Sequence, residues 1–295
     1  MRARLLAMAG AVATLGCPSR APAQAADWKA VDGAMGRAAV EQPGGVHRFN
    51  FPRSDLRVVV DDVTLKPAFA LGGWIAMAGT PANAMVMGDL VLTGAEVTPV
   101  ITALQAGGVE QTAIHHHVIR EEPHVYYVHV RAHGDAAKIA ATIRTAVAAT
   151  KIPAPAPATA AAGDPGIDTA GVAKALGYAG RMNGGVYQVT VPRAETLREN
   201  GMEIPPVMGL TTAINFQPTG GGKAAITGDF VLLAGEVNAV IQALRANGIE
   251  AVSLHSHLLD DEPRLYFMHF WANDDAVTLA RGLAAGLAKT NVKRP

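Results

Sequence analysis

Hydrophobic and polar positions along the chain follow a helical period in some segments and an alternating or continuously apolar pattern in others. Spacings of three and four residues predict helices within 27–40, 93–107 and 134–150. Alternating or apolar runs predict the strands between them, at 46–51, 58–60, 69–78, 84–92, 109–119 and 125–131. The same series of segments then occurs a second time, so the pattern predicts two copies of one helix-and-strand unit.

The repeat sets the domain plan. Pro52-Arg53 corresponds to Pro192-Arg193, and Gly88-Asp89 corresponds to Gly228-Asp229, each 140 positions later. Between the copies, residues 151–167 form an Ala/Pro linker, a composition that favours an extended, semi-rigid spacer. We therefore expect a first repeat domain at 27–150 and a second at 168–295.

Short loops between adjacent strands predict that each repeat is a mainly antiparallel sheet with helices on one face. The expected fold class is thus α+β, built by tandem duplication. Two such halves often pack as a pseudo-dimer, although the linker leaves their relative placement open. Thr93-Gly94-Ala95-Glu96 is expected to form a capping box at the start of a helix, with Glu96 three residues after Thr93.

The N-terminus has the features of a signal peptide spanning residues 1–25. Two arginines precede an apolar stretch, and Ala23-Gln24-Ala25 provides a cleavage site. Cys17, the single cysteine, follows Thr14-Leu15-Gly16, which resembles a bacterial lipoprotein box with Thr in place of the usual Leu. We predict an exported protein, periplasmic or secreted. Lipid anchoring through Cys17 is the alternative, and membrane contact is expected only in that case.

Composition narrows the function classes. The chain has 295 residues, 49% of them hydrophobic and 17% charged, which is sufficient for two globular domains. No stretch after the leader approaches the roughly 20 apolar residues of a transmembrane helix. The formal net charge is zero, which argues against electrostatic binding of nucleic acid. The composition is compatible with a small-molecule or envelope ligand as the partner.

Histidines concentrate at two matched segments, 114–129 and 254–269. In each, a His-x-His pair is followed by Glu-Pro and then by a further His, and six of the ten histidines occupy these positions. Alternate residues of a strand share a face, so each pair should project two imidazoles together. Three imidazoles and one carboxylate suit zinc, iron, copper or manganese. The predicted metal ligands are His115, His117, Glu122 and His129 in one copy and His255, His257, Glu262 and His269 in the other.

Strand register limits this prediction. If residues 120–123 form a four-residue turn, His129 falls on the face opposite His115 and His117. An odd loop or one β-bulge restores convergence. The sequence therefore predicts an odd loop or a bulge near 120–124, and again near 260–264.

Four further residues are candidates for the same region. Asp89 and Asp229 each follow a glycine inside an apolar strand, where each could orient an imidazole, although burial against backbone amides is the plainer interpretation. Tyr127 and Phe267 share a strand face with His129 and His269 and are expected to line the pocket.

The repeated pattern G-D-[LF]-V-L, E-V, A-L, G-[VI]-E, H-x-H, E-P, H resembles the LppY/LpqO family of exported bacterial proteins, some of which are lipoproteins. The resemblance covers nearly all of both repeats. It implies an envelope or secreted location and a two-copy architecture, and it brings no known activity. The leading hypothesis is an exported metal-binding protein, with metal-dependent catalysis left undecided. The alternative is a non-catalytic envelope module, for ligand binding or interaction, whose histidines are structural.

Overall fold

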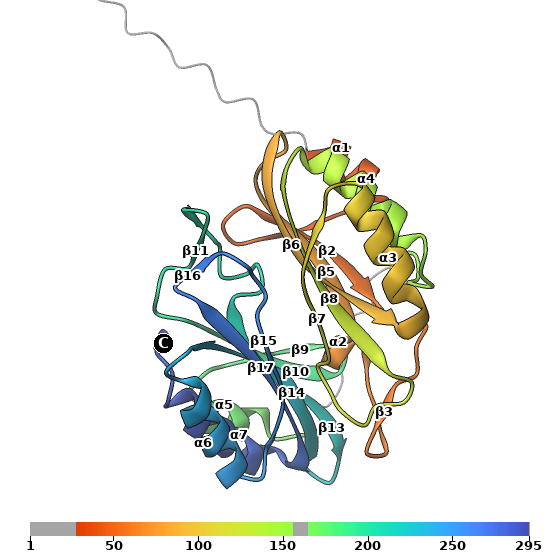
Figure 1. Cartoon of the computed structure of the whole chain (residues 1–295). Helices are drawn as coiled ribbons and strands as arrows, with labels where there is room; N and C mark the ends of the chain where they lie inside the picture. Colours follow the sequence, from red (N-terminus) through yellow and green to blue (C-terminus); the bar gives the residue numbers. More distant parts are fainter. Residues whose placement is uncertain (1–27, 156–164, 295) are drawn as a thin grey trace, which may run out of the picture.

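A computed structural model describes residues 28–155 and 165–294. The predicted signal peptide (1–25), Cys17 and the centre of the linker lie outside these ranges. Each half contains a six-stranded antiparallel sheet with helices against it. Figure 1 shows the two sheets lying between two outer layers of helices, α1, α3 and α4 on one side and α5, α6 and α7 on the other. The prediction of a duplicated α+β fold is confirmed.

The first half has the strand order β1-β2-β5-β6-β8-β7. Its elements are α1 (Trp28–Met35), β1 (Val40–Gln42), β2 (Val46–Pro52), β3 (Val59–Val60), β4 (Val63–Thr64), α2 (Pro67–Ala70), β5 (Gly72–Thr80), β6 (Asn83–Thr93), α3 (Gly94–Ala106), β7 (Glu110–His115), β8 (Val125–Gly134) and α4 (Ala136–Val147). The strands β3 and β4 form a separate two-stranded hairpin.

The second half repeats this order as β9-β10-β13-β14-β17-β15. Its elements are α5 (Thr169–Leu176), β9 (Arg181–Asn183), β10 (Val186–Pro192), β11 (Arg198–Glu199), β12 (Met202–Glu203), β13 (Thr211–Gly220), β14 (Lys223–Leu233), α6 (Val237–Ala246), β15 (Glu250–His255), β16 (Asp261–Glu262), β17 (Leu265–Asp275) and α7 (Ala276–Leu287). A small sheet of β12, β11 and β16 is additional.

Both faces of each main sheet are buried. On β6, Val86 and Leu90 pack into the core beneath the helices, whereas Met85, Met87 and Val91 point to the opposite face. Strands covered on both sides read as nearly continuous apolar runs, which explains the composition of residues 84–92. The second face of the sheet is therefore where the other half packs.

The interface between the halves has its own hydrophobic cores. One combines Ala76 and Met87 of the first half with Ile204 and Met208 of the second. Gln217 adds a polar link, because its side chain accepts a hydrogen bond from the backbone N–H of Lys66 and donates one to the carbonyl of Thr64, both at 2.8 Å. Apolar burial and backbone hydrogen bonds thus hold the two halves face to face.

In each half a buried arginine side chain joins separate elements through hydrogen bonds and an ion pair. The Arg53 side chain is fully buried, and its Nη1 donates to Glu96 Oε2 at 2.7 Å and to the Val91 carbonyl at 2.8 Å. Glu96 also accepts from the Thr93 N–H, as the capping box predicted, and from the N–H of Lys151. The cluster joins the end of β2, the start of α3 and the chain after α4. Arg193 and Glu236 repeat it in the second half at 2.6 Å.

No helix within 28–155 or 165–294 is both long enough and apolar enough to cross a membrane.

Candidate metal centre between the halves

The histidine strand ends earlier than predicted. The predicted strand 109–119 stops as β7 at His115, and residues 116–124 form a loop in place of a tight turn. The physical reason lies in Glu122, whose backbone N–H and carbonyl both bond Val59 of β3 at 2.9 Å. The loop therefore pairs with a neighbouring hairpin instead of extending the sheet. In the second half, residues 261–262 pair with β11 in the same way.

Register brings the predicted imidazoles to one face. His115 pairs with Tyr127 and Ala113 with His129, so both histidines point toward the other half. The loop between the strands has an odd number of residues, as predicted. A separate shift in register lies between Gln111 and Ala113, beyond the pairs that align the histidines. β15 and β17 repeat the arrangement, with a shift between Ala251 and Ser253.

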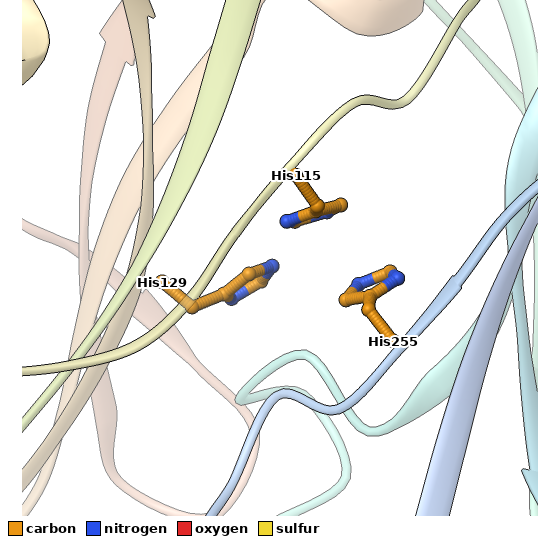
Figure 2. Close-up of side chains that lie close together, drawn as sticks. All are labelled: His115, His129 and His255. Atoms are coloured by element: carbon orange, nitrogen blue, oxygen red, sulfur yellow. The ribbon is translucent and has the colours of Figure 1, made fainter.

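All six histidines meet in one cluster shared by the two halves. The three shortest separations between histidine ring centroids each join one half to the other: 3.6 Å for His115 and His255, 3.8 Å for His129 and His257, and 3.9 Å for His117 and His269. Figure 2 shows three of these rings, with His115 and His129 from the first half facing His255 from the second. The expectation of one separate site per repeat therefore becomes a single shared centre.

The two glutamates are not brought into this centre. Glu122 and Glu262 are exposed, and each precedes a proline in a cis peptide bond. The carboxylates beside the imidazoles belong to Asp89 and Asp229. Register explains their position, because Asp89 on β6 pairs directly with His129 on β8. The glycine before Asp89 fits the same crowded strand, since a Cβ on Gly88 would lie 2.6 Å from the Trp74 carbonyl oxygen.

Each aspartate faces two histidines. Asp89 Oδ2 lies 3.4 Å from His117 Nε2 and 3.8 Å from His129 Nε2. Asp229 repeats these contacts, 3.2 Å from His257 Nε2 and 3.9 Å from His269 Nε2. The donors are thus arranged with approximate twofold symmetry.

Aromatic rings cover the centre on both sides. Tyr127 stacks on His117 with centroids 3.4 Å apart, and Phe267 stacks on His257 at the same separation. The Tyr127 hydroxyl donates to the Ala70 carbonyl at 2.8 Å, which fixes that ring in place. The stacked rings hold the imidazole planes and exclude water from the donors.

Burial sets the protonation of the cluster. Desolvation, and then the neighbouring imidazoles, lowers the pKa of His115, His129 and His255 well below the ordinary value. Neutral imidazoles each offer a nitrogen lone pair. Burial, reinforced by Asp229, raises the pKa of Asp89 to about 8. A cation among the donors would reverse this last effect, because it favours the carboxylate form.

The donor atoms lack hydrogen-bond partners. Among the described residues, ten of the eleven buried side-chain atoms without a partner belong to the six histidines and two aspartates. Leaving a buried polar atom unpaired costs roughly 1–3 kcal/mol. Four sets of three donors have ligand atoms within 4.8 Å of one another: His115, His129 and His255; His115, His117 and His269; Asp89, His117 and His129; and Asp229, His255 and His257. Nitrogen and carboxylate donors at this spacing fit a divalent transition metal.

A groove runs along the outer edge of β7 beside this centre. Its lining includes Ile101, Gln105, Glu110, Ile114 and Leu259, and none of the eight donors. The groove is therefore a surface feature separate from the cluster of donors.

Comparisons with known proteins give a family and little else. A family model described as a Domain of Unknown Function (DUF1259) matches residues 29–149 and 170–289. No curated protein matches the chain. A trimeric bacterial microcompartment shell protein, PduB, is 13% identical over 86% of this chain and 90% of its own, with a TM-score of 0.22. EtuB from Clostridium kluyveri is 11% identical over 85% and 90%, with a TM-score of 0.20. At these TM-scores, neither likeness supports an argument about this chain.

Proposed function

Because the chain belongs to a family described as a Domain of Unknown Function (DUF1259), which supplies no activity, we propose from the site alone that it binds a divalent transition metal between its two halves. The observation that carries this proposal is the set of imidazole nitrogens and carboxylate oxygens that are buried without hydrogen-bond partners. Structural histidines, the alternative, would use those atoms to bond their neighbours.

His269 supports the metal interpretation directly. Its Nδ1 lies 2.6 Å from the Gly228 carbonyl, which can only accept, so Nδ1 carries the proton. Its Nε2 then offers a lone pair toward the cluster. A backbone carbonyl that fixes the tautomer in this way is the usual support for a metal-bound histidine.

The donor set also favours some metals over others. Six imidazoles and two carboxylates suit zinc, copper or iron better than manganese, which prefers oxygen ligands. Catalysis needs a coordination position open to substrate. Since the cluster nitrogens are shielded from solvent, the geometry supports metal binding more directly than a metal-dependent reaction.

Metal content tests this function. The untagged protein should purify with, or take up on titration, at least one equivalent of zinc, copper or iron, measured by mass spectrometry. The variant His115→Ala/His255→Ala should lose most of it. The variant His116→Ser/His124→Arg, which places the residues of the second copy in the first, serves as the matched control and should retain the metal. Absence of uptake by the folded wild-type protein would refute the proposal.

Export is proposed on the predicted signal peptide and the resemblance to the LppY/LpqO family. Cell fractionation and the mass of the mature chain test it. Cleavage after Ala25 gives a lipid-free protein, whereas lipid anchoring through Cys17 would add acyl mass that Cys17→Ala abolishes.

A further inference from the structure

We propose that the centre holds two metal ions, that each ion is bound by residues of both halves, and that the two aspartates bridge the ions. This inference rests on the proposed metal binding and specifies its stoichiometry and connectivity. The first argument is the number of donors. Six imidazoles and two carboxylates exceed what one tetrahedral ion takes, and eight donors are enough for two such ions.

The spacing of ligand atoms supplies a first set. The ring of His115 lies 4.9 Å from His117 and 5.3 Å from His269, while the closer ring of His255, at 3.6 Å, is its symmetry counterpart and belongs to the other set. The nitrogens of His115, His117 and His269 fall within 4.8 Å of one another. These three residues form the first set, with two ligands from the first half and one from β17 of the second.

The approximate twofold symmetry of the cluster maps the first set onto His255, His257 and His129, which form the second set. His255 lies 4.9 Å from His257, and His129 lies 3.8 Å from His257. This set takes two ligands from the second half and one from β8 of the first. In this assignment each set crosses the interface, and the approximate twofold axis exchanges the sets. The competing arrangement has one ion within each half, held by Asp89, His117 and His129 or by Asp229, His255 and His257.

The aspartates connect the two sets. Asp89 Oδ2 faces His117 of the first set and His129 of the second. Asp229 faces His257 of the second set and His269 of the first. A carboxylate next to ligands of both ions is positioned to bridge them. Bridged pairs lie roughly 3.5–4 Å apart in two-metal sites.

Copper loading of the metal-free protein tests the stoichiometry. The wild-type chain should bind two equivalents of Cu(II). Its double-integrated electron paramagnetic resonance signal should fall below the copper content, because bridged ions couple. One equivalent, or two equivalents with a full uncoupled signal, would overturn the two-ion centre while leaving metal binding intact. No uptake would instead refute the proposed function itself.

Two double variants test the crossing. His117→Ala/His269→Ala removes two ligands of one set and should leave one copper with the signal of an isolated ion. His117→Ala/His129→Ala removes one ligand from each set and should leave none. If each half bound its own ion, the results would be exchanged: the first variant would bind none and the second would bind one. Circular dichroism checks that both variants are folded, and His→Gln substitutions at the same positions replace a variant that is not.

Discussion

A carboxylate buried among imidazoles is costly unless a cation offsets its charge. Asp89 is only 4% exposed, its Oδ1 has no hydrogen-bond partner, and burial raises its pKa. These features make it a poor structural residue in the absence of a metal. They are what a metal ligand would show before its ion is bound.

Asp89→Asn should therefore weaken metal binding. Removing the charge leaves the shape of the side chain but removes an anionic donor, and we expect a loss of affinity on the order of 10- to 100-fold. Titration against a competing chelator measures the change. Glu122→Gln is the control, since Glu122 is exposed and lies outside the centre. Equal effects of the two substitutions would contradict the assignment of Asp89.

The histidines could be identified from the sequence because the duplication repeats them at one spacing. The sequence offered Asp89 and Asp229 only as candidates to orient an imidazole, and it could not place them among the donors, because their proximity to the histidines depends on which strands are neighbours. Asp89 lies forty residues from His129 in sequence, and only the pairing of β6 with β8 places them side by side. Glu122 is close to the histidines along the chain, yet its loop turns toward β3.

At the level of elements, the buried arginine clusters connect strand ends to helix starts. Burial alone would raise the pKa of Glu96, but the hydrogen bonds from Arg53, Thr93 and Lys151 outweigh it and lower that pKa below the ordinary value. Glu236 has the same shift from the same contacts in the second half. Both glutamates therefore favour folding in their charged form.

The sign of the pH dependence follows. A carboxyl whose folded-state pKa is depressed stabilises the fold above its unfolded pKa of about 4.3, and the contribution is lost as pH falls through the folded value. The unfolding free energy of metal-free protein should fall below about pH 4.3, and Glu96→Gln/Glu236→Gln should reduce that slope. Denaturant titrations across pH 3–6 measure it. Glu122→Gln/Glu262→Gln is the control, and an unchanged slope in the first variant would refute the role.

The long strands and helices were largely predictable because each has a clear apolar pattern, whereas short strands such as Arg198–Glu199 and Asp261–Glu262 have none. The segment 116–124 was not, because Val118 and Ile119 extend the apolar pattern of β7 although the chain has left the sheet. Val118 is buried in the interface core rather than in the strand. An apolar sequence pattern therefore predicts that a side chain is buried, but it does not predict which part of the protein the side chain packs against.

For the whole molecule, a metal bound between the halves, as proposed, would act as a ligand of the assembled state. Removing it with a chelator should lower the unfolding temperature, because a ligand present at about 100 times its Kd stabilises by roughly 2.7 kcal/mol. Differential scanning calorimetry of metal-loaded and chelated protein measures the shift. The variant His115→Ala/His255→Ala should show no response to the chelator. A shift of equal size in that variant would place the stabilising metal elsewhere.

The relative placement of the two halves could not be predicted from the sequence. Alternation on β6 shows that both faces are apolar, but two buried faces are compatible with several partners. The reciprocal contacts across the interface, such as His129 with His257 and His117 with His269, require the three-dimensional arrangement.

The approximate twofold symmetry of the donors has an evolutionary consequence. A chain of half this length that dimerised in the same arrangement would assemble an equivalent ligand set from two identical copies. Joining the copies in one gene adds the freedom to diverge, and the second half already carries Phe267 where the first has Tyr127. Each ring stacks on one histidine of the cluster. Fusion thus allows the residues around each side of the shared centre to change independently.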